Sequence, residues 1–183
     1  DVSTVRIWER TVEEEAPQQG IHPDTGSLLS AEDLRALEAF HEGATGYFGK
    51  MFSYIVDFVR KGVKEGRFTE EQARADLQIA LWYSYSCINL TSYEYYYRAM
   101  QWMPDSEKNA KGCATWYYRY SCALMYCSRL EEAMKYAEQG AKEEPDYPWI
   151  WLQVGKLRYY FGDKKGRAIV DDTAIVTDEI KKR

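Results

Sequence analysis

The chain has 183 residues, which is long enough for one domain or a short helical array with a sizeable core. Its formal net charge is −5, and a nucleic-acid-binding surface usually requires an excess of basic residues, so we expect no nucleic-acid partner. No segment is both apolar enough and long enough to span a bilayer, so we expect no membrane partner.

The cysteine pattern favours a reducing compartment. Cys87, Cys113, Cys122 and Cys127 match no zinc-binding spacing and include no Cys-x-x-Cys motif. We therefore predict free, buried thiols and a cytoplasmic location. The general character of the sequence suggests a bacterial-type protein.

Residues 1–29 are predicted to form an N-terminal arm or loop. Val2, Val5 and Ile7 indicate a short extended stretch, and turn-forming residues follow at Pro17, Gly20, Pro23 and Gly26.

Residues 30–79 are predicted to form a helical cap. Ser30 followed by Asp33 resembles a capping box and predicts the start of a first helix, which Gly43 interrupts. Apolar residues three and four positions apart predict a second helix over residues 47–64, and Gly66 is a suitable stop for it.

A second capping box, Thr69 with Gln72, predicts a helix that continues to about Leu90. Thr91 with Glu94 predicts the next start, and Pro104 ends that helix early.

Three further helices are predicted in the C-terminal half, over residues 114–126, from residue 128 to about residue 143, and over residues 149–161. Ser128 with Glu131 is expected to cap the second of them. A last amphipathic helix is predicted over residues 168–180.

The second half of the chain repeats itself at a fixed interval. Tyr83, Tyr117 and Trp151 follow one another at steps of 34 residues (from 83 to 117 and from 117 to 151), and so do Cys87, Ser121 and Gly155. A fixed period of this length is typical of stacked helical hairpins. Leu124, Ala133, Gly140 and Pro145 complete the best-formed copy.

Over about residues 80–170 these positions resemble the tetratricopeptide repeat family. The resemblance implies an all-α fold, a right-handed α-solenoid of about three degenerate helical hairpins with an N-terminal helical cap. The repeats would occupy residues 80–183. Pro104 and Arg167 depart from the family pattern in the outer copies.

The resemblance also implies a function, because proteins of this family bind proteins or peptides on the concave face formed by the first helix of each hairpin. We therefore expect a scaffold or adaptor with an unidentified protein or peptide partner, no cofactor and no enzymatic activity. Carried over to this chain, the partner-binding residues would be Ser84, Tyr85, Ile88, Tyr118, Arg119, Cys122, Tyr126, Lys156 and Tyr159.

Three alternatives stay open. The tyrosines could serve only to pack neighbouring hairpins. The chain could be a self-associating structural module whose Tyr-rich faces pair in a homodimer, or the aromatic groove could bind a small ligand or support catalysis. No catalytic or phosphate-binding motif is visible. His22 and His41 show no metal-ligand spacing, so we expect both to be solvated and predict no metal site.

Overall fold

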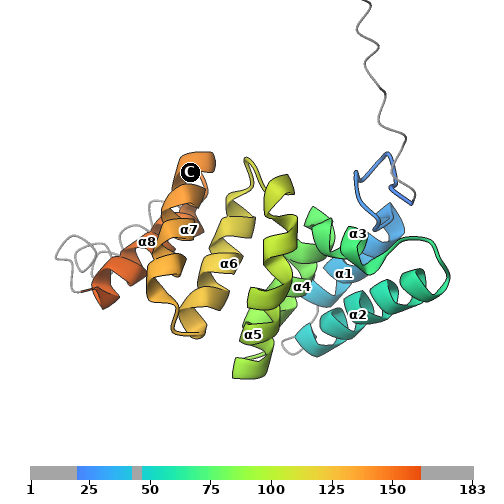
Figure 1. Ribbon diagram of the computed structural model, residues 1–183, viewed down its shortest axis with the longest axis horizontal. Helices are drawn as coiled ribbons and strands as arrows, with labels where there is room; N and C mark the ends of the chain where they lie inside the picture. Colours follow the sequence, from blue (N-terminus) through green and yellow to red (C-terminus); the bar gives the residue numbers. More distant parts are fainter. Residues whose placement is uncertain (1–19, 43–46, 162–183) are drawn as a thin grey trace, which may run out of the picture.

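The computed structural model describes residues 20–42 and 47–161, and in these ranges the chain is all-helical, as predicted (Figure 1). One isolated β-bridge joins His22 and Ser27. The elements are α1 (Ala31–Glu42), α2 (Phe48–Lys64), α3 (Glu70–Ala75), α4 (Leu77–Asn89), α5 (Tyr93–Trp102), the 3₁₀ helix η1 (Met103–Asn109), α6 (Ala114–Tyr126), α7 (Leu130–Glu143) and α8 (Pro148–Tyr160).

The helices from α4 onward form a row in which each packs on the next. Contacts join α4 to α5, α5 to α6, α6 to α7, and α7 to α8. They also join alternate members, α4 to α6 and α6 to α8. Helix α2 packs on α4, and Figure 1 shows α2 and α8 at opposite ends of the molecule.

Several predicted helix ends are confirmed. The Ser30 hydroxyl accepts from the Asp33 backbone N–H at 3.1 Å, while the Asp33 carboxylate accepts from the Ser30 N–H at 2.9 Å. Thr69 and Gln72 form the second capping box. Gly66 follows α2 with a φ of +70°, a conformation that favours glycine.

The single helix predicted over residues 69–90 is wrong, because two helices, α3 and α4, lie there. Asp76 separates them, with a ψ of 122° that belongs to extended backbone. Its carboxylate accepts from the Ile79 N–H at 3.0 Å and so caps α4.

The same carboxylate fixes the N-terminal turn. It accepts from the Ser27 hydroxyl at 2.8 Å and from the Leu28 N–H at 2.7 Å, and Asp76 is 8% exposed. Residues 20–29 of the predicted arm therefore form a turn docked on the start of α4, with Leu28 and Leu29 buried. The rest of that arm lies outside the described residues.

Two predicted caps are also wrong. Thr91 and Ser128 adopt positive φ angles of 36° and 62°, so neither occupies the N-cap position. Ser92 and Arg129 stand there, without a side-chain capping bond. The early end of α5 before Pro104 is confirmed, while the helix predicted over residues 168–180 lies outside the described residues.

The boundary predicted between residues 79 and 80 falls inside α4. One hydrophobic cluster extends across it, from Leu28 near the N-terminal turn to Leu157 in α8.

The repeated positions are buried in two of the copies. Tyr83 and Tyr117 are 5% and 6% exposed, and both Cys87 and Ser121 are fully buried. Trp151 departs from this pattern: it is 45% exposed and donates its indole N–H to the Pro145 carbonyl at 2.7 Å.

Gly140 allows α7 to approach its neighbours closely. A Cβ atom added there would lie 2.6 Å from the Tyr117 Cβ and 2.8 Å from the Ile150 Cδ1. Real Cβ atoms essentially never lie this close, so the packing of α6, α7 and α8 requires glycine at this position.

Asp76→Ala should destabilise the fold by about 3 kcal/mol, because it removes a helix cap and leaves two buried donors of the N-terminal turn without an acceptor. Chemical denaturation measures this loss. Asp57→Ala is the control, since Asp57 is exposed on α2 and forms only a weak ion pair with Arg60. Equal effects of the two changes would contradict the assigned role of Asp76.

Gly140→Ala should lower stability by about 1–3 kcal/mol through overpacking, although alanine normally favours a helix over glycine. Gly49→Ala in α2 is the matched control: nothing lies within 4 Å of its added Cβ, so it should be neutral or stabilising by up to about 1 kcal/mol. Thermal unfolding of both variants shows whether each change raises or lowers the stability. An increase in stability with Gly140→Ala would contradict the close packing.

Candidate functional site

A partly open cleft of about 500 Å³ lies along α4 and α6. Its walls come from the end of α1, one side of α4, one side of α6, and the segment that leads into α8. Most of its lining side chains are aromatic: Trp82, Tyr85, Tyr118, Tyr126, Tyr147 and Trp149.

The structure brings most of the predicted binding residues together in this cleft. Those that line it are Tyr85, Ile88, Tyr118, Arg119, Cys122 and Tyr126. Lys156 and Tyr159 are not among the lining residues. Lys156 is half-buried on α8 and close enough to influence Cys122 electrostatically, whereas Tyr159 is 45% exposed.

The prediction for Ser84 is wrong. Ser84 is fully buried and donates its hydroxyl to the Leu81 carbonyl at 3.1 Å, so no partner can reach it. The physical reason is that α4 is covered by α2, α5 and α6.

Arg119 places a positive charge in the cleft. Its guanidinium lies over the Tyr85 ring, with Cζ 4.6 Å from the ring centroid, and Nη1 donates to the Leu81 carbonyl at 2.6 Å. Burial lowers the pKa of Arg119, yet an arginine remains protonated at neutral pH. Within residues 20–42 and 47–161 no Asp or Glu forms an ion pair with it.

Tyr85 is held in place from several sides. Its hydroxyl shares a hydrogen bond of 2.8 Å with Nδ1 of His41, and the centroids of the Phe48 and Tyr85 rings lie 5.3 Å apart in an edge-to-face arrangement. Burial raises the pKa of Tyr85, so the phenol is neutral at physiological pH. A rigid, neutral ring therefore supports the Arg119 guanidinium.

Three further side chains near Arg119 are neutral as well. Burial raises the pKa values of Tyr118 and Tyr147, and it raises the pKa of the Cys122 thiol to about 11. Tyr118 and Cys122 are close enough to influence each other's pKa. The cleft thus contains a cation whose charge no neighbouring side chain of the described chain balances.

Sequence reasoning missed part of the lining. His41 was expected to be solvated; it remains exposed but also binds Tyr85. It lies on α1, outside the 34-residue register, so the repeat spacing could not point to it. Tyr147 and Trp149 lie at the start of α8 and also line the cleft. Neither was predicted, because the first binding residue expected in this helix was Lys156.

The described residues contain no group of three His, Cys, Asp or Glu side chains placed to hold a metal ion. None of the described helices is long and apolar enough to cross a membrane. All four thiols are free, as predicted, although only Cys87 and Cys122 are buried while Cys113 and Cys127 are half-buried.

Comparison of the chain with protein-family models, with curated proteins and with solved structures gives no match.

The buried thiols should react slowly with an alkylating reagent. With pKa values of about 12 for Cys87 and about 11 for Cys122, only about 0.1% or less of either thiol is ionised at pH 8. Labelling of the native protein at pH 8, with the modified sites located by mass spectrometry, should find Cys113 and Cys127 modified first. Labelling in denaturant is the control and should modify all four. Modification of Cys122 as fast as Cys113 would contradict the closed packing around it.

Proposed function

We propose that the chain is a protein- or peptide-binding scaffold whose cleft holds a segment with an acidic side chain against Arg119. The observation that supports this most strongly is the Arg119 charge, which lies in a cleft and has no carboxylate partner among the described residues. A ligand carboxylate would supply the missing partner.

The proposal includes the architecture expected from the repeat, a short solenoid of tetratricopeptide-like hairpins. The contacts of α4 to α8 with their nearest and next-nearest neighbours support it, since stacked hairpins pack in this way. The matching burial of Tyr83 with Tyr117, and of Cys87 with Ser121, supports the 34-residue register.

The energetics favour a charged ligand group. A guanidinium removed from water without an anion carries a desolvation cost, which its bond to the Leu81 carbonyl and the Tyr85 ring offset only in part. A carboxylate that forms two parallel hydrogen bonds with the guanidinium is a strong, charge-assisted partner. The cleft therefore binds an Asp or Glu side chain better than a neutral one.

Aromatic side chains supply the apolar part of the interaction. Tyr126 and Trp149 line the cleft and are 43% and 53% exposed, so both can cover a ligand. Large rings of this kind contribute contact area at a low cost in conformational entropy. Lys156, which has no ion pair among the described residues, places a second cation nearby.

Binding rather than catalysis also agrees with the state of the cleft thiol. A nucleophilic cysteine requires a lowered pKa, and the pKa of Cys122 is raised to about 11.

Arg119→Met should weaken the binding of acidic peptides by tenfold or more, because a hydrogen bond to a charged group contributes about 1.5–3 kcal/mol. The measurement is a screen of a random peptide array with the full chain, followed by affinity determination for the peptides that bind. We expect these peptides to contain an Asp or Glu next to an aromatic or apolar residue.

Arg129→Met is the matched control, because Arg129 is exposed outside the cleft and already pairs with Glu132 at 3.1 Å. It should leave the affinity unchanged, and circular dichroism should show the same helix content for both variants. An array without any bound peptide, or bound peptides that are indifferent to Arg119→Met, would contradict the proposed function.

A further inference from the structure

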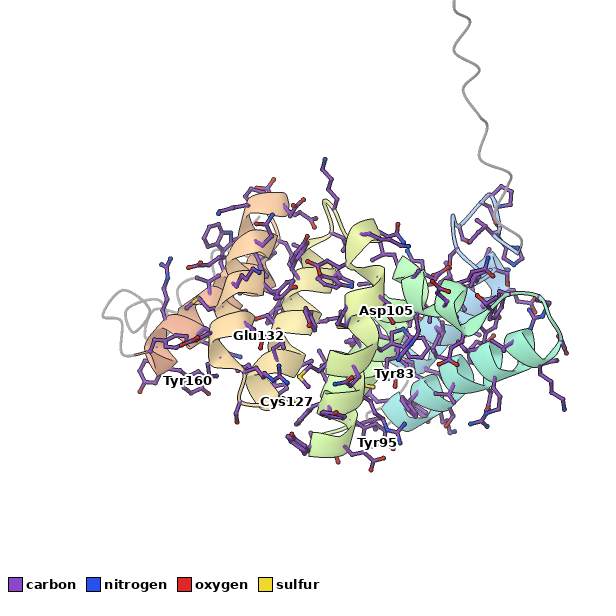
Figure 2. The ribbon with its side chains drawn as sticks, in the orientation of Figure 1. Tyr83, Tyr95, Asp105, Cys127, Glu132 and Tyr160 are labelled. Atoms are coloured by element: carbon purple, nitrogen blue, oxygen red, sulfur yellow. The ribbon has the colours of Figure 1, made fainter. Side chains whose placement is uncertain are left out.

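A second concave surface lies between α2 and α5. It is a groove of about 430 Å³ that shares no lining residue with the cleft. Helices α2 and α5 both pack on α4, and Tyr83 of α4 lies between them at the groove (Figure 2). Tyr83 and Tyr85 are two positions apart on α4, which places them about 200° apart around the helix axis. The groove and the cleft therefore lie on opposite sides of α4.

One wall of the groove is an apolar stripe on α2. Ile55, Val59 and Val63 recur at every fourth position, and Val56 adds to the same side. Val63 is 39% exposed, although the stripe continues inward to the fully buried Ile55. The stripe thus runs from the core to the surface.

The floor of the groove is aromatic. The ring of Trp102 stacks on that of Tyr83 at 4.6 Å, and the Arg74 guanidinium lies over Trp102 at 4.8 Å. Burial raises the pKa of Tyr83, which therefore stays neutral. A preformed apolar floor loses little conformational entropy when a ligand binds.

The rim of the groove is mainly basic, in contrast to the acidic chain as a whole. Arg60 and Lys64 stand one helical turn apart on α2, Arg98 stands on α5, and Glu70 is the acidic member. Arg98 already pairs with Glu94 at 2.8 Å and Arg60 pairs more weakly with Asp57 at 3.8 Å, whereas Lys64 has no ion pair within the described part of the chain. We therefore expect the α2 side of the rim, through Lys64, to attract an anion.

We propose that this groove binds an amphipathic α-helix of another polypeptide, with its apolar stripe against Val59, Val63 and Trp102 and its acidic residues beside Arg60 and Lys64. A groove between two helices accepts a third helix through residues spaced by three and four positions. The basic rim selects acidic over basic helices, because exposed charges contribute more to specificity and association rate than to affinity. This second binding site is independent of the function proposed for the cleft.

The test uses the full chain and two synthetic helical peptides of about 15 residues. One carries leucines at positions three and four apart with glutamates beside them, and the other has lysines in place of the glutamates. Fluorescence anisotropy should show the glutamate peptide binding at least tenfold more tightly than the lysine peptide. No binding of the glutamate peptide, or equal binding of both, would overturn the proposal.

Variants locate the bound helix. Val63→Asp and Lys64→Glu should each lower the affinity for the glutamate peptide several-fold. The helix content of the protein should not change, since both residues are at the surface. Lys50→Glu is the control: it makes the same charge change on α2, outside the groove, and should have no effect. An equal loss of affinity with Lys50→Glu would show that the peptide helix does not bind in this groove.

Arg119→Met separates the two sites. Retention of glutamate-peptide binding in this variant supports the groove, and loss of binding would place the peptide in the cleft and overturn the inference.

Discussion

The buried carboxylate of Asp76 is the interaction on which the arrangement depends. It ends α3, caps α4 and holds the N-terminal turn through Ser27 and Leu28. Helix α4 begins directly after Asp76, because the carboxylate accepts the Ile79 N–H at its first turn. Both concave surfaces use that helix, since Tyr85 lines the cleft and Tyr83 lines the groove. The contacts of one buried carboxylate thus hold together the segments around the helix that both proposed binding sites share.

The two concave surfaces carry basic residues, although the chain as a whole is acidic. The chain is acidic, with a formal net charge of −5, yet the cleft contains Arg119 and the groove is bordered by Arg60 and Lys64. The acidic side chains of the described helices mostly lie exposed at the surface, as Glu94 and Glu132 do in their ion pairs. Local placement therefore decides which ligands the surfaces attract, and net charge alone would suggest the opposite preference.

The sequence predicted those features that depend on local patterns. Helix periodicity, the capping boxes at Ser30 and Thr69 and the stop at Gly66 all concern residues within one or two turns of each other. The break at Asp76 was missed although its capping bond to Ile79 is local, and its other partners, Ser27 and Leu28, are 49 and 48 positions away. In the cleft, the family resemblance placed Tyr118, Arg119 and Cys122 on one surface, but it could not show that neighbouring helices bury Ser84 or that His41 reaches Tyr85.

The central claim is that Arg119 binds a ligand carboxylate. The most direct test is a double-mutant cycle between Arg119→Met and a Glu→Gln change in a peptide bound by the cleft, with all four affinities measured by calorimetry. The account predicts a coupling free energy of about 1.5 kcal/mol or more, as expected for a desolvated charged hydrogen bond. Additive effects of the two changes, with a coupling energy near zero, would contradict it.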